Sequence, residues 1–234
     1  SKLLNIAASD FPELMIALMS STTLSISASA LAALKAKAGL AAKRAKYIMR
    51  IKFYDEKIFD NFDKNDLNII DIGTGSGCIA ISLKASFLNS QVVGVDIQEE
   101  ALFIAKENAA LNNLKVNFQL RDALKLKIEQ EKYDVVVSNP PYVLNSEKLE
   151  MRENVLAYEP HTALFVNDSD PLLFYKAIAN WACKSLKPNG LLYFEINEKY
   201  AIQTKKYLEH VGFINCESKE DIFDKPRMIK AQKR

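Results

Sequence analysis

Residues 139–142, with the sequence Asn-Pro-Pro-Tyr, have the types and spacing to bind a flat NH2 group. They follow residues 133–137, a β-branched run that predicts a buried strand, so they should lie in the loop where that strand ends. Two consecutive prolines fix φ and remove two backbone donors, which leaves rigid carbonyl acceptors. The Asn139 side-chain oxygen and the Pro140 carbonyl can each accept one N–H bond while the Tyr142 ring packs against the plane. The alternative is a plain Pro-Pro turn in which asparagine is a cap.

A second chemical signal lies in residues 71–77, with the sequence Asp-Ile-Gly-Thr-Gly-Ser-Gly, between a predicted strand and a predicted helix. Glycines there let the backbone approach a ligand, and the helix N-terminus offers free N–H groups. The spacing is G-x-G-x-G, and Cys78 occupies the place of the third glycine in the dinucleotide fingerprint, which weakens that reading. Asp96 ends the next predicted strand, where a carboxylate can accept bonds from two ribose hydroxyls. The pair indicates an adenosine-containing cofactor, with a tight turn and a capping Asp as the alternative.

Asp122 follows the third predicted strand and should therefore lie at the same end of the sheet as Gly73 and Asp96. Its carboxylate could accept a bond from an adenine amino group. Taken alone, it is more typical of a helix cap.

These residues must be positioned by strands and helices in alternation. We expect strands at 67–72, 91–96, 115–120, 133–138 and 191–196, and near 213–214 and 227–229. We expect helices at 78–88, 99–112, 199–211 and from Pro171 to 186, with a turn at 187–190. This alternation predicts an α/β domain whose parallel sheet is covered by helices on both faces.

The chain divides by composition into residues 1–60, rich in helix formers, and residues 61–234, which hold the alternating pattern. We expect a small N-terminal helical region, atypical or incomplete for the domain and able to dock substrate, followed by the catalytic domain. Residues 1–52 carry eight Lys or Arg against two Asp or Glu, a net charge of +6 within a total of +2, so the remainder carries −4. The basic part could contact RNA or an acidic partner, although a solvated helix face is the more economical interpretation.

The 234 residues, 49% of them hydrophobic, suffice for a sizeable core. Three cysteines without paired spacing indicate a reducing compartment, so we expect a cytoplasmic protein with neither disulfides nor zinc. The two histidines have no partner at the spacing of metal ligands, so we expect no metal site. The uncharged residues 14–34 are broken by Ser and Thr and fit two short helices better than a membrane span. We expect a monomer.

Together, the glycine turn, the acidic strand ends and Asn-Pro-Pro-Tyr resemble a class I S-adenosylmethionine-dependent methyltransferase. Within that class, Asn-Pro-Pro-Tyr is similar to the signature of enzymes that methylate planar nitrogens in adenine, guanine or glutamine. The resemblance implies a Rossmann-like, mostly parallel seven-stranded sheet. It also implies S-adenosylmethionine as cofactor and S-adenosylhomocysteine as product.

Further segments narrow the resemblance to the N5-glutamine methyltransferases of peptide chain release factors. They are residues 157–165, with Tyr-Glu-Pro-His, then 170–175, 194–196 and 221–228, and the resemblance runs from about 67 to 229. It implies methylation of the glutamine in the Gly-Gly-Gln motif of a release factor, without direct nucleic-acid binding. A related enzyme that modifies a ribosomal protein, and N-methylation of adenine or guanine in nucleic acid, stay as alternatives.

The resemblance also assigns roles by position. It implies that Gly73, Gly75 and Gly77 line the methionine part of the cofactor, with Asp71 and Thr74 in the same turn. Around the nucleoside it implies Asp96 at the ribose, Ile97 against adenine, and Asp122 with Ala123 at the adenine edge. For the target amide it implies Asn139, Pro140, Pro141 and Tyr142, with Asn139 also near the cofactor, and Glu159 and Glu195 supporting the loops. For Glu159 and Glu195 the alternative is a structural hydrogen bond, because buried carboxylates are rare unless they are partnered.

The sequence departs from the family before its first strand, where the Ile-Pro-Arg-Pro-Glu-Thr-Glu segment is absent, and in its N-terminal region, where a five-helix domain is usual. Asn197 stands where many relatives have Gly, which we interpret as lineage variation. An amide nitrogen is a weak nucleophile, so holding both N–H hydrogens should align its lone pair for transfer. We expect no catalytic histidine and no metal.

Overall fold

The computed structural model describes residues 66–144, 165, 166, 168–221 and 224–234. The expected helices in residues 1–60, and the segment 157–164 with Glu159, lie outside these residues. Within the described part, no helix is both long and apolar enough to cross a bilayer.

A seven-stranded sheet forms the centre of the described chain, in the order β3-β2-β1-β4-β7-β9-β8. Its parallel part comprises β1 (Asn68–Ile72), β2 (Gln91–Asp96), β3 (Asn117–Leu120), β4 (Tyr133–Ser138) and β7 (Leu186–Glu195). β8 (Phe213–Glu220) and β9 (Pro226–Lys233) complete it in antiparallel pairing, with β9 between β7 and β8. The expected mostly parallel sheet is therefore confirmed.

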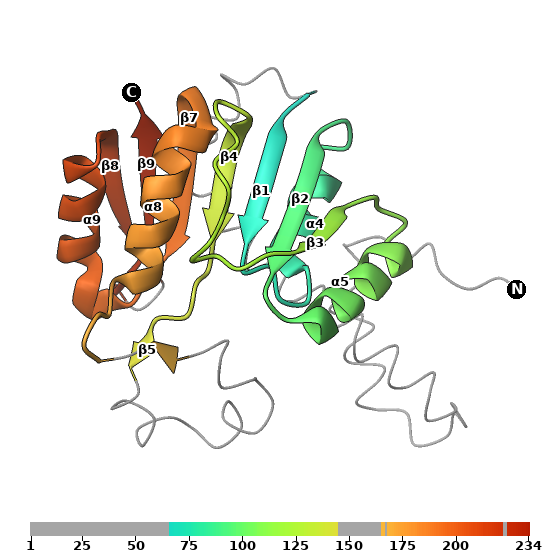
Figure 1. The fold of residues 1–234 in the computed structure, drawn as a ribbon, viewed down its shortest axis with the longest axis horizontal. Coiled ribbons are helices and arrows are strands. Elements are labelled where there is room, and N and C mark those ends of the chain that lie inside the picture. The colour runs from blue at the N-terminus through green and yellow to red at the C-terminus, as the bar shows by residue number, and fades with distance from the viewer. Residues whose placement is uncertain (1–65, 145–164, 167, 222–223) are drawn as a thin grey trace, which may run out of the picture. The chain divides into compact units, whose positions relative to one another are not determined.

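The helices that link these strands lie on the two faces of the sheet (Figure 1). They are α4 (Cys78–Ser86), α5 (Glu99–Leu111), α8 (Leu173–Ser185) and α9 (Ala201–His210), and the short 3-10 helix η3 (Glu198–Tyr200) precedes α9. Alternate residues of each central strand point to opposite sides. In β1, Ile70 joins the core beneath α8 and α9, whereas Ile69 joins the core beneath α4. Both faces are buried, which is why these strands are continuous apolar runs.

Two of the expected assignments were wrong. Helix α8 begins at Leu173 and not at Pro171, because residues 170–172 form a turn in which the Leu173 N–H donates to the Asp170 carbonyl (3.1 Å). Residues 187–190 belong to β7 and not to a separate turn. They form a bulge, since β4 pairs through Tyr133 with Leu186 and through Val135 with Leu191. In it Asn189 has a φ of 64°, a conformation that asparagine tolerates better than most residues.

The C-terminal strands are longer than expected, at eight residues each. A further two-stranded parallel sheet, β5 (Val143–Leu144) with β6 (Phe165–Val166), was not expected at all. β5 directly follows residues 139–142, so this small sheet continues the chain away from them (Figure 1).

Candidate active site

The carboxyl ends of β1, β2 and β4 meet at one edge of the sheet. Ile72, the last residue of β1, pairs with Val95 of β2 on one side and with Ser138 of β4 on the other. The order β2-β1-β4 makes this the point where successive connections leave in opposite directions, the usual ligand site of open α/β sheets. The glycine turn, Asp96 and residues 139–142 all begin at this edge, as the sequence predicted.

The glycine turn after β1 has a backbone that favours glycine at three positions. Gly73, Gly75 and Gly77 have φ values of 74°, 54° and 82°, all in the left-handed region. A Cβ on Gly77 would lie 3.0 Å from Ile81 Cδ1 and 3.1 Å from Ala105 Cβ, whereas one on Gly75 would meet nothing within 4 Å. Gly77 therefore serves packing, and Gly75 borders open space.

Asp71 is hydrogen-bonded to the glycine turn and to the first turn of α4. Its Oδ2 accepts bonds from the Thr74 hydroxyl (2.6 Å) and the Ala80 N–H (3.1 Å), while Oδ1 has no hydrogen-bond partner among the described residues. Burial, with a smaller contribution from the nearby Asp96 carboxylate, raises the pKa of Asp71 to about 7 despite these two bonds. The turn therefore rests on a carboxyl group that titrates near neutral pH.

Asp96, at the end of β2, is joined to the same turn. Its Oδ2 accepts from the Gly75 N–H (2.8 Å) and its Oδ1 from the Gln98 N–H (3.0 Å). Each carboxylate oxygen can accept more than one bond, so both retain capacity for a ligand hydroxyl. The next side chain, Ile97, is 61% exposed, which is unusual for isoleucine.

Residues 139–142 begin beside the glycine turn. The Ser138 hydroxyl donates to the Ile72 carbonyl (2.7 Å), which ties the end of β4 to β1. A Cβ on Gly73 would lie 3.9 Å from the main-chain oxygen of Asn139. Pro140 is buried, whereas Asn139, Pro141 and Tyr142 are half-buried.

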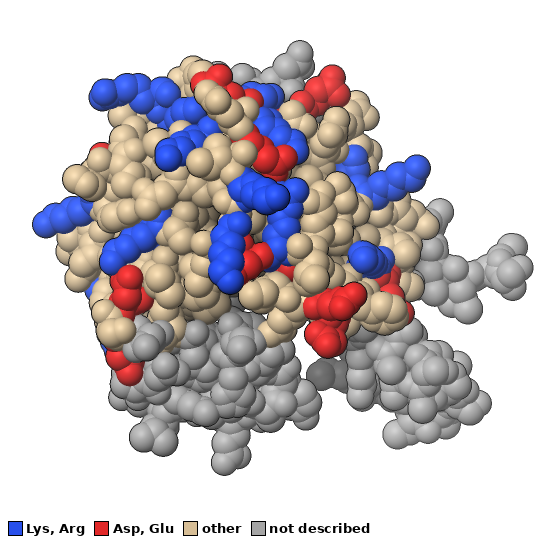
Figure 2. Space-filling model, viewed as in Figure 1, with Lys and Arg blue, Asp and Glu red and all other residues tan. Residues whose placement is uncertain are grey.

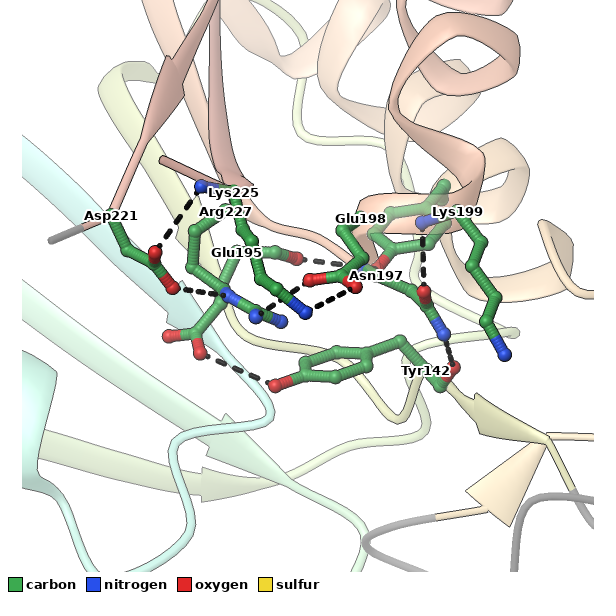
Figure 3. Close-up of polar contacts among 9 residues, drawn as sticks. Tyr142, Glu195, Asn197, Glu198, Lys199, Asp221, Lys225 and Arg227 are labelled. Carbon is green, nitrogen blue, oxygen red and sulfur yellow. Dashed lines mark hydrogen bonds and ion pairs between the residues drawn. The ribbon is translucent and has the colours of Figure 1, made fainter. Parts of the chain in front are cut away.

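Tyr142 is held at both its side chain and its main chain (Figure 3). Its hydroxyl donates to Glu195 Oε1 (3.3 Å), and its carbonyl accepts from Asn197 Nδ2 (3.2 Å). Both partners come from the end of β7 and the residues that follow it, next to β4 in the sheet. Glu195 thus lies where a loop-supporting residue is expected.

An ionic cluster of Glu198, Asp221, Lys225 and Arg227 lies near Glu195 (Figure 3). Arg227 Nε is 3.2 Å from Asp221 Oδ2, and its second nitrogen is 3.2 Å from Glu198 Oε2, which shares its carboxylate with Lys225. Partial burial acts against the charge of Arg227, but the bond to Asp221 and the negative charges of Asp221 and Glu198 outweigh it and raise its pKa. This cluster joins Lys225 and Arg227 to Glu198 of η3, and Arg227 also to Asp221.

Asp122 makes contacts of a turn residue. Its Oδ1 accepts from the Leu124 N–H (2.8 Å), and its Oδ2 lies 3.6 Å from Lys125 Nζ. No helix begins there, so the helix-cap interpretation was wrong. Ala123 is half-buried against the core under α8 and α9.

Sequence reasoning missed Asn197 and Tyr175. Asn197 is buried and bonded to Tyr142, and its N–H donates to the Tyr175 hydroxyl (3.3 Å). Neither residue type stands out in a sequence. The one available signal was an amide two residues after Glu195, just past the end of the predicted strand 191–196.

Comparison with known proteins gives one domain-level match. Residues 63–227 match the family described as "Methyltransferase domain".

Two curated proteins named release factor glutamine methyltransferase are also similar to this chain. The one from Flavobacterium psychrophilum is 48% identical over 165 residues, which cover 70% of this chain and 58% of that protein. The one from Bacteroides thetaiotaomicron is 45% identical over 166 residues, covering 70% and 60%. The chain thus spans about 60% of the length of these relatives.

Among solved structures, a magnesium protoporphyrin IX methyltransferase from Synechocystis, with bound SAM, matches at a TM-score of 0.54. The sequence identity is 16%, over 99% of this chain and 100% of that one. At this identity the likeness is one of fold.

Proposed function

This chain belongs to the methyltransferase domain family and has the Rossmann-like fold of its class I members. From that premise we propose that it transfers a methyl group from S-adenosylmethionine to the side-chain amide of the glutamine in the Gly-Gly-Gln motif of peptide chain release factors. The observation that carries the proposal is the proximity of Asn139 to Gly73, which brings an amide-binding segment to a nucleotide-type turn. The 48% and 45% identity to proteins named for this activity supports the same substrate.

The residues at the sheet edge fit the cofactor. Beside Gly75 there is space that a Cβ would enter without contact, and the buried Oδ1 of Asp71 has acceptor capacity left among the described residues. Gly73, Thr74, Gly75 and Gly77 would hold the methionine part, and Asp96 the ribose. Ile97, Asp122 and Ala123 would border the adenine. When bound, S-adenosylmethionine supplies an electrophilic methyl group on a sulfonium, and S-adenosylhomocysteine is the product.

The chain's own part in the reaction is to hold and orient the amide. The Asn139 side-chain oxygen and the Pro140 carbonyl would each accept one N–H, so the nitrogen is turned by two fixed acceptors. Tyr142 would pack against the amide plane, with Pro141 fixing the chain between them. These acceptors stabilise the positive charge that develops on nitrogen as it gains the methyl group. The methylated nitrogen is acidic because of that charge, so its proton passes to water without a strong base. Glu195 would act by holding the Tyr142 hydroxyl.

Charge distribution bears on the nucleic-acid alternative. Figure 2 shows one face of the molecule, where Lys and Arg side chains are interspersed with Asp and Glu. Several cations of the described chain are ion-paired, among them Arg121 with Glu129 and Lys176 with Asp170. Phosphate binding depends on clustered cations, so this pattern favours a protein substrate. That substrate makes the cytoplasm the proposed compartment.

The test is a methyl-transfer assay with methyl-labelled S-adenosylmethionine. One arm contains a release factor, a second the same factor with the Gly-Gly-Gln glutamine changed to alanine, a third a ribosomal protein fraction, and a fourth tRNA and rRNA. We expect label only in the first arm. Label in the second arm, in ribosomal protein or in RNA would refute the proposed substrate. So would a complete lack of transfer to the intact release factor.

A further inference from the structure

Asn197 makes two side-chain hydrogen bonds that join separate parts of the chain. Its Nδ2 donates to the Tyr142 carbonyl (3.2 Å), and its Oδ1 accepts from the Lys199 N–H (3.0 Å), which caps η3. The residue is only 8% exposed, so its amide has little access to water. Buried amides are conformationally restricted when donor and acceptor are both engaged.

The backbone of Asn197 is fixed as well. Its N–H donates to the Tyr175 hydroxyl, which itself donates to the Glu195 carbonyl, both at 3.3 Å. Tyr175 is buried and packs edge-on against Phe194, with ring centroids 5.3 Å apart. The Asn197 amide is therefore presented to Tyr142 from a rigid support.

We propose that Asn197 is a positioning residue for the methyl transfer, because it sets the main chain of Tyr142 and, through it, the amide-binding segment. Pro140 and Pro141 have fixed φ values, so a displacement of the Tyr142 main chain is passed on to the Pro140 carbonyl. Glu195 holds the ring of Tyr142 and Asn197 holds its backbone. This inference rests on the proposed function.

Two substitutions separate the bond to Tyr142 from the cap on η3. Asn197→Asp keeps an acceptor for the Lys199 N–H but replaces the donor to Tyr142 by a carboxylate oxygen, which repels the carbonyl. Asn197→Ser also keeps a capping acceptor, carries no charge and is too short to replace the amide. The matched control is Asn180→Asp, which removes the donor from Asn180 Nδ2 to the Tyr207 hydroxyl (2.8 Å) between α8 and α9.

Three quantities are measured for each protein: kcat and KM for release-factor methylation at saturating cofactor, the Kd of S-adenosylmethionine, and amide hydrogen exchange of residues 142–144. We expect both Asn197 variants to lower kcat about tenfold, since small displacements of positioned groups cost catalysis strongly. The cofactor Kd should stay within about twofold, because Asn197 follows β7, and β4 lies between β7 and the strand β1 that leads into the glycine turn. Exchange at 142–144 should accelerate, and Asn180→Asp should change none of the three.

Wild-type kcat and wild-type exchange in both Asn197 variants would overturn the proposal. So would a fall in kcat accompanied by an equal loss of cofactor affinity, which would indicate a general structural role. If the wild-type protein does not methylate a release factor, the proposed function fails, and the exchange comparison still decides whether Asn197 fixes Tyr142. Unfolding curves establish that each variant is folded. If Asn197→Asp does not fold, Asn197→Ser alone decides the test.

Discussion

The Gly75 N–H donates to the Asp96 carboxylate across 2.8 Å, which joins the turn after β1 directly to the end of β2. The two sequence signals that together indicated an adenosine-containing cofactor are therefore one hydrogen-bonded unit. A change at Asp96 affects the turn as well as any ligand that the carboxylate holds.

Replacing Asp96 by alanine should weaken cofactor binding more than it lowers kcat at saturation. Charge-assisted hydrogen bonds are worth roughly 1.5–3 kcal/mol each, so the Kd of S-adenosylmethionine should rise at least about tenfold. Asp96→Asn retains one acceptor oxygen, so its Kd should lie between those of the wild type and the alanine variant. Calorimetric titration checks this, and an unchanged Kd for the alanine variant would show that the ribose contact is misplaced.

Replacing Asn139 by alanine should remove most turnover and leave cofactor affinity nearly intact. One of two acceptors for the target amide is lost, and a lost orienting or charge-stabilising contact typically costs about 100-fold in kcat. Single-turnover methylation of a release factor measures the effect beside a cofactor titration. Near-normal transfer by this variant would refute the proposed role.

Replacing Gly77 by alanine should destabilise the fold more than the same change at Gly212. Both glycines have positive φ, 82° and 103°, and share a backbone cost of about 1–2 kcal/mol. Only at Gly77 would the new Cβ crowd three side chains at 3.0–3.1 Å, which adds roughly 1–3 kcal/mol. Urea unfolding of the two variants tests the difference, and equal free energies of unfolding would contradict the packing role of Gly77.

Replacing Gly75 by alanine should act on the cofactor instead. The new Cβ would meet nothing within 4 Å, so the stability loss should be limited to the cost of a φ of 54°. The methyl group would enter the space that we assign to the cofactor, and the Kd should rise. A Gly75→Ala protein that binds S-adenosylmethionine as the wild type does would exclude this space as the cofactor site.

Asp71 should make stability depend on pH in the direction opposite to that of a salt-bridged carboxylate. Its pKa is about 7 in the folded protein against an ordinary value of 3.8. Between these values the folded state holds a proton that the unfolded state has lost, so the free energy of unfolding falls as pH rises from about 4 to 7. In Asp71→Asn this contribution is absent. Unfolding curves over this pH range should show the wild type losing stability relative to the variant, and parallel profiles would contradict the raised pKa.

The order and type of the central elements could be predicted because each strand is a short β-branched or apolar run buried on both faces. The edge that holds Gly73, Asp96 and Asn139 followed from parallel topology, since all three come at strand ends. The bulge at 187–190 could not be predicted in the same way. Asn189 and Gly190 indicate a turn locally, and only the pairing of Leu186 with Tyr133 brings them into β7.

The same limit explains why the contact of Asn197 with Tyr142 was not predicted. Its residue type indicates a cap, and it does cap η3 through the Lys199 N–H. Its second bond reaches Tyr142, 55 residues earlier in the chain, through the adjacency of β4 and β7. Contacts between side chains so far apart in sequence depend on tertiary structure that no local pattern encodes.

The position of β9 determines how the protein should respond to C-terminal truncation. The last strand in the described chain is an interior strand, whose Ile229 and Ala231 are fully buried between β7 and β8. A protein shortened before Pro226 would leave β8 without a neighbour and β7 with an open, aggregation-prone edge. Removal of residues 226–234 should therefore abolish the antiparallel part of the sheet and leave β7, which carries Glu195 and leads to Asn197, without its neighbour on that side.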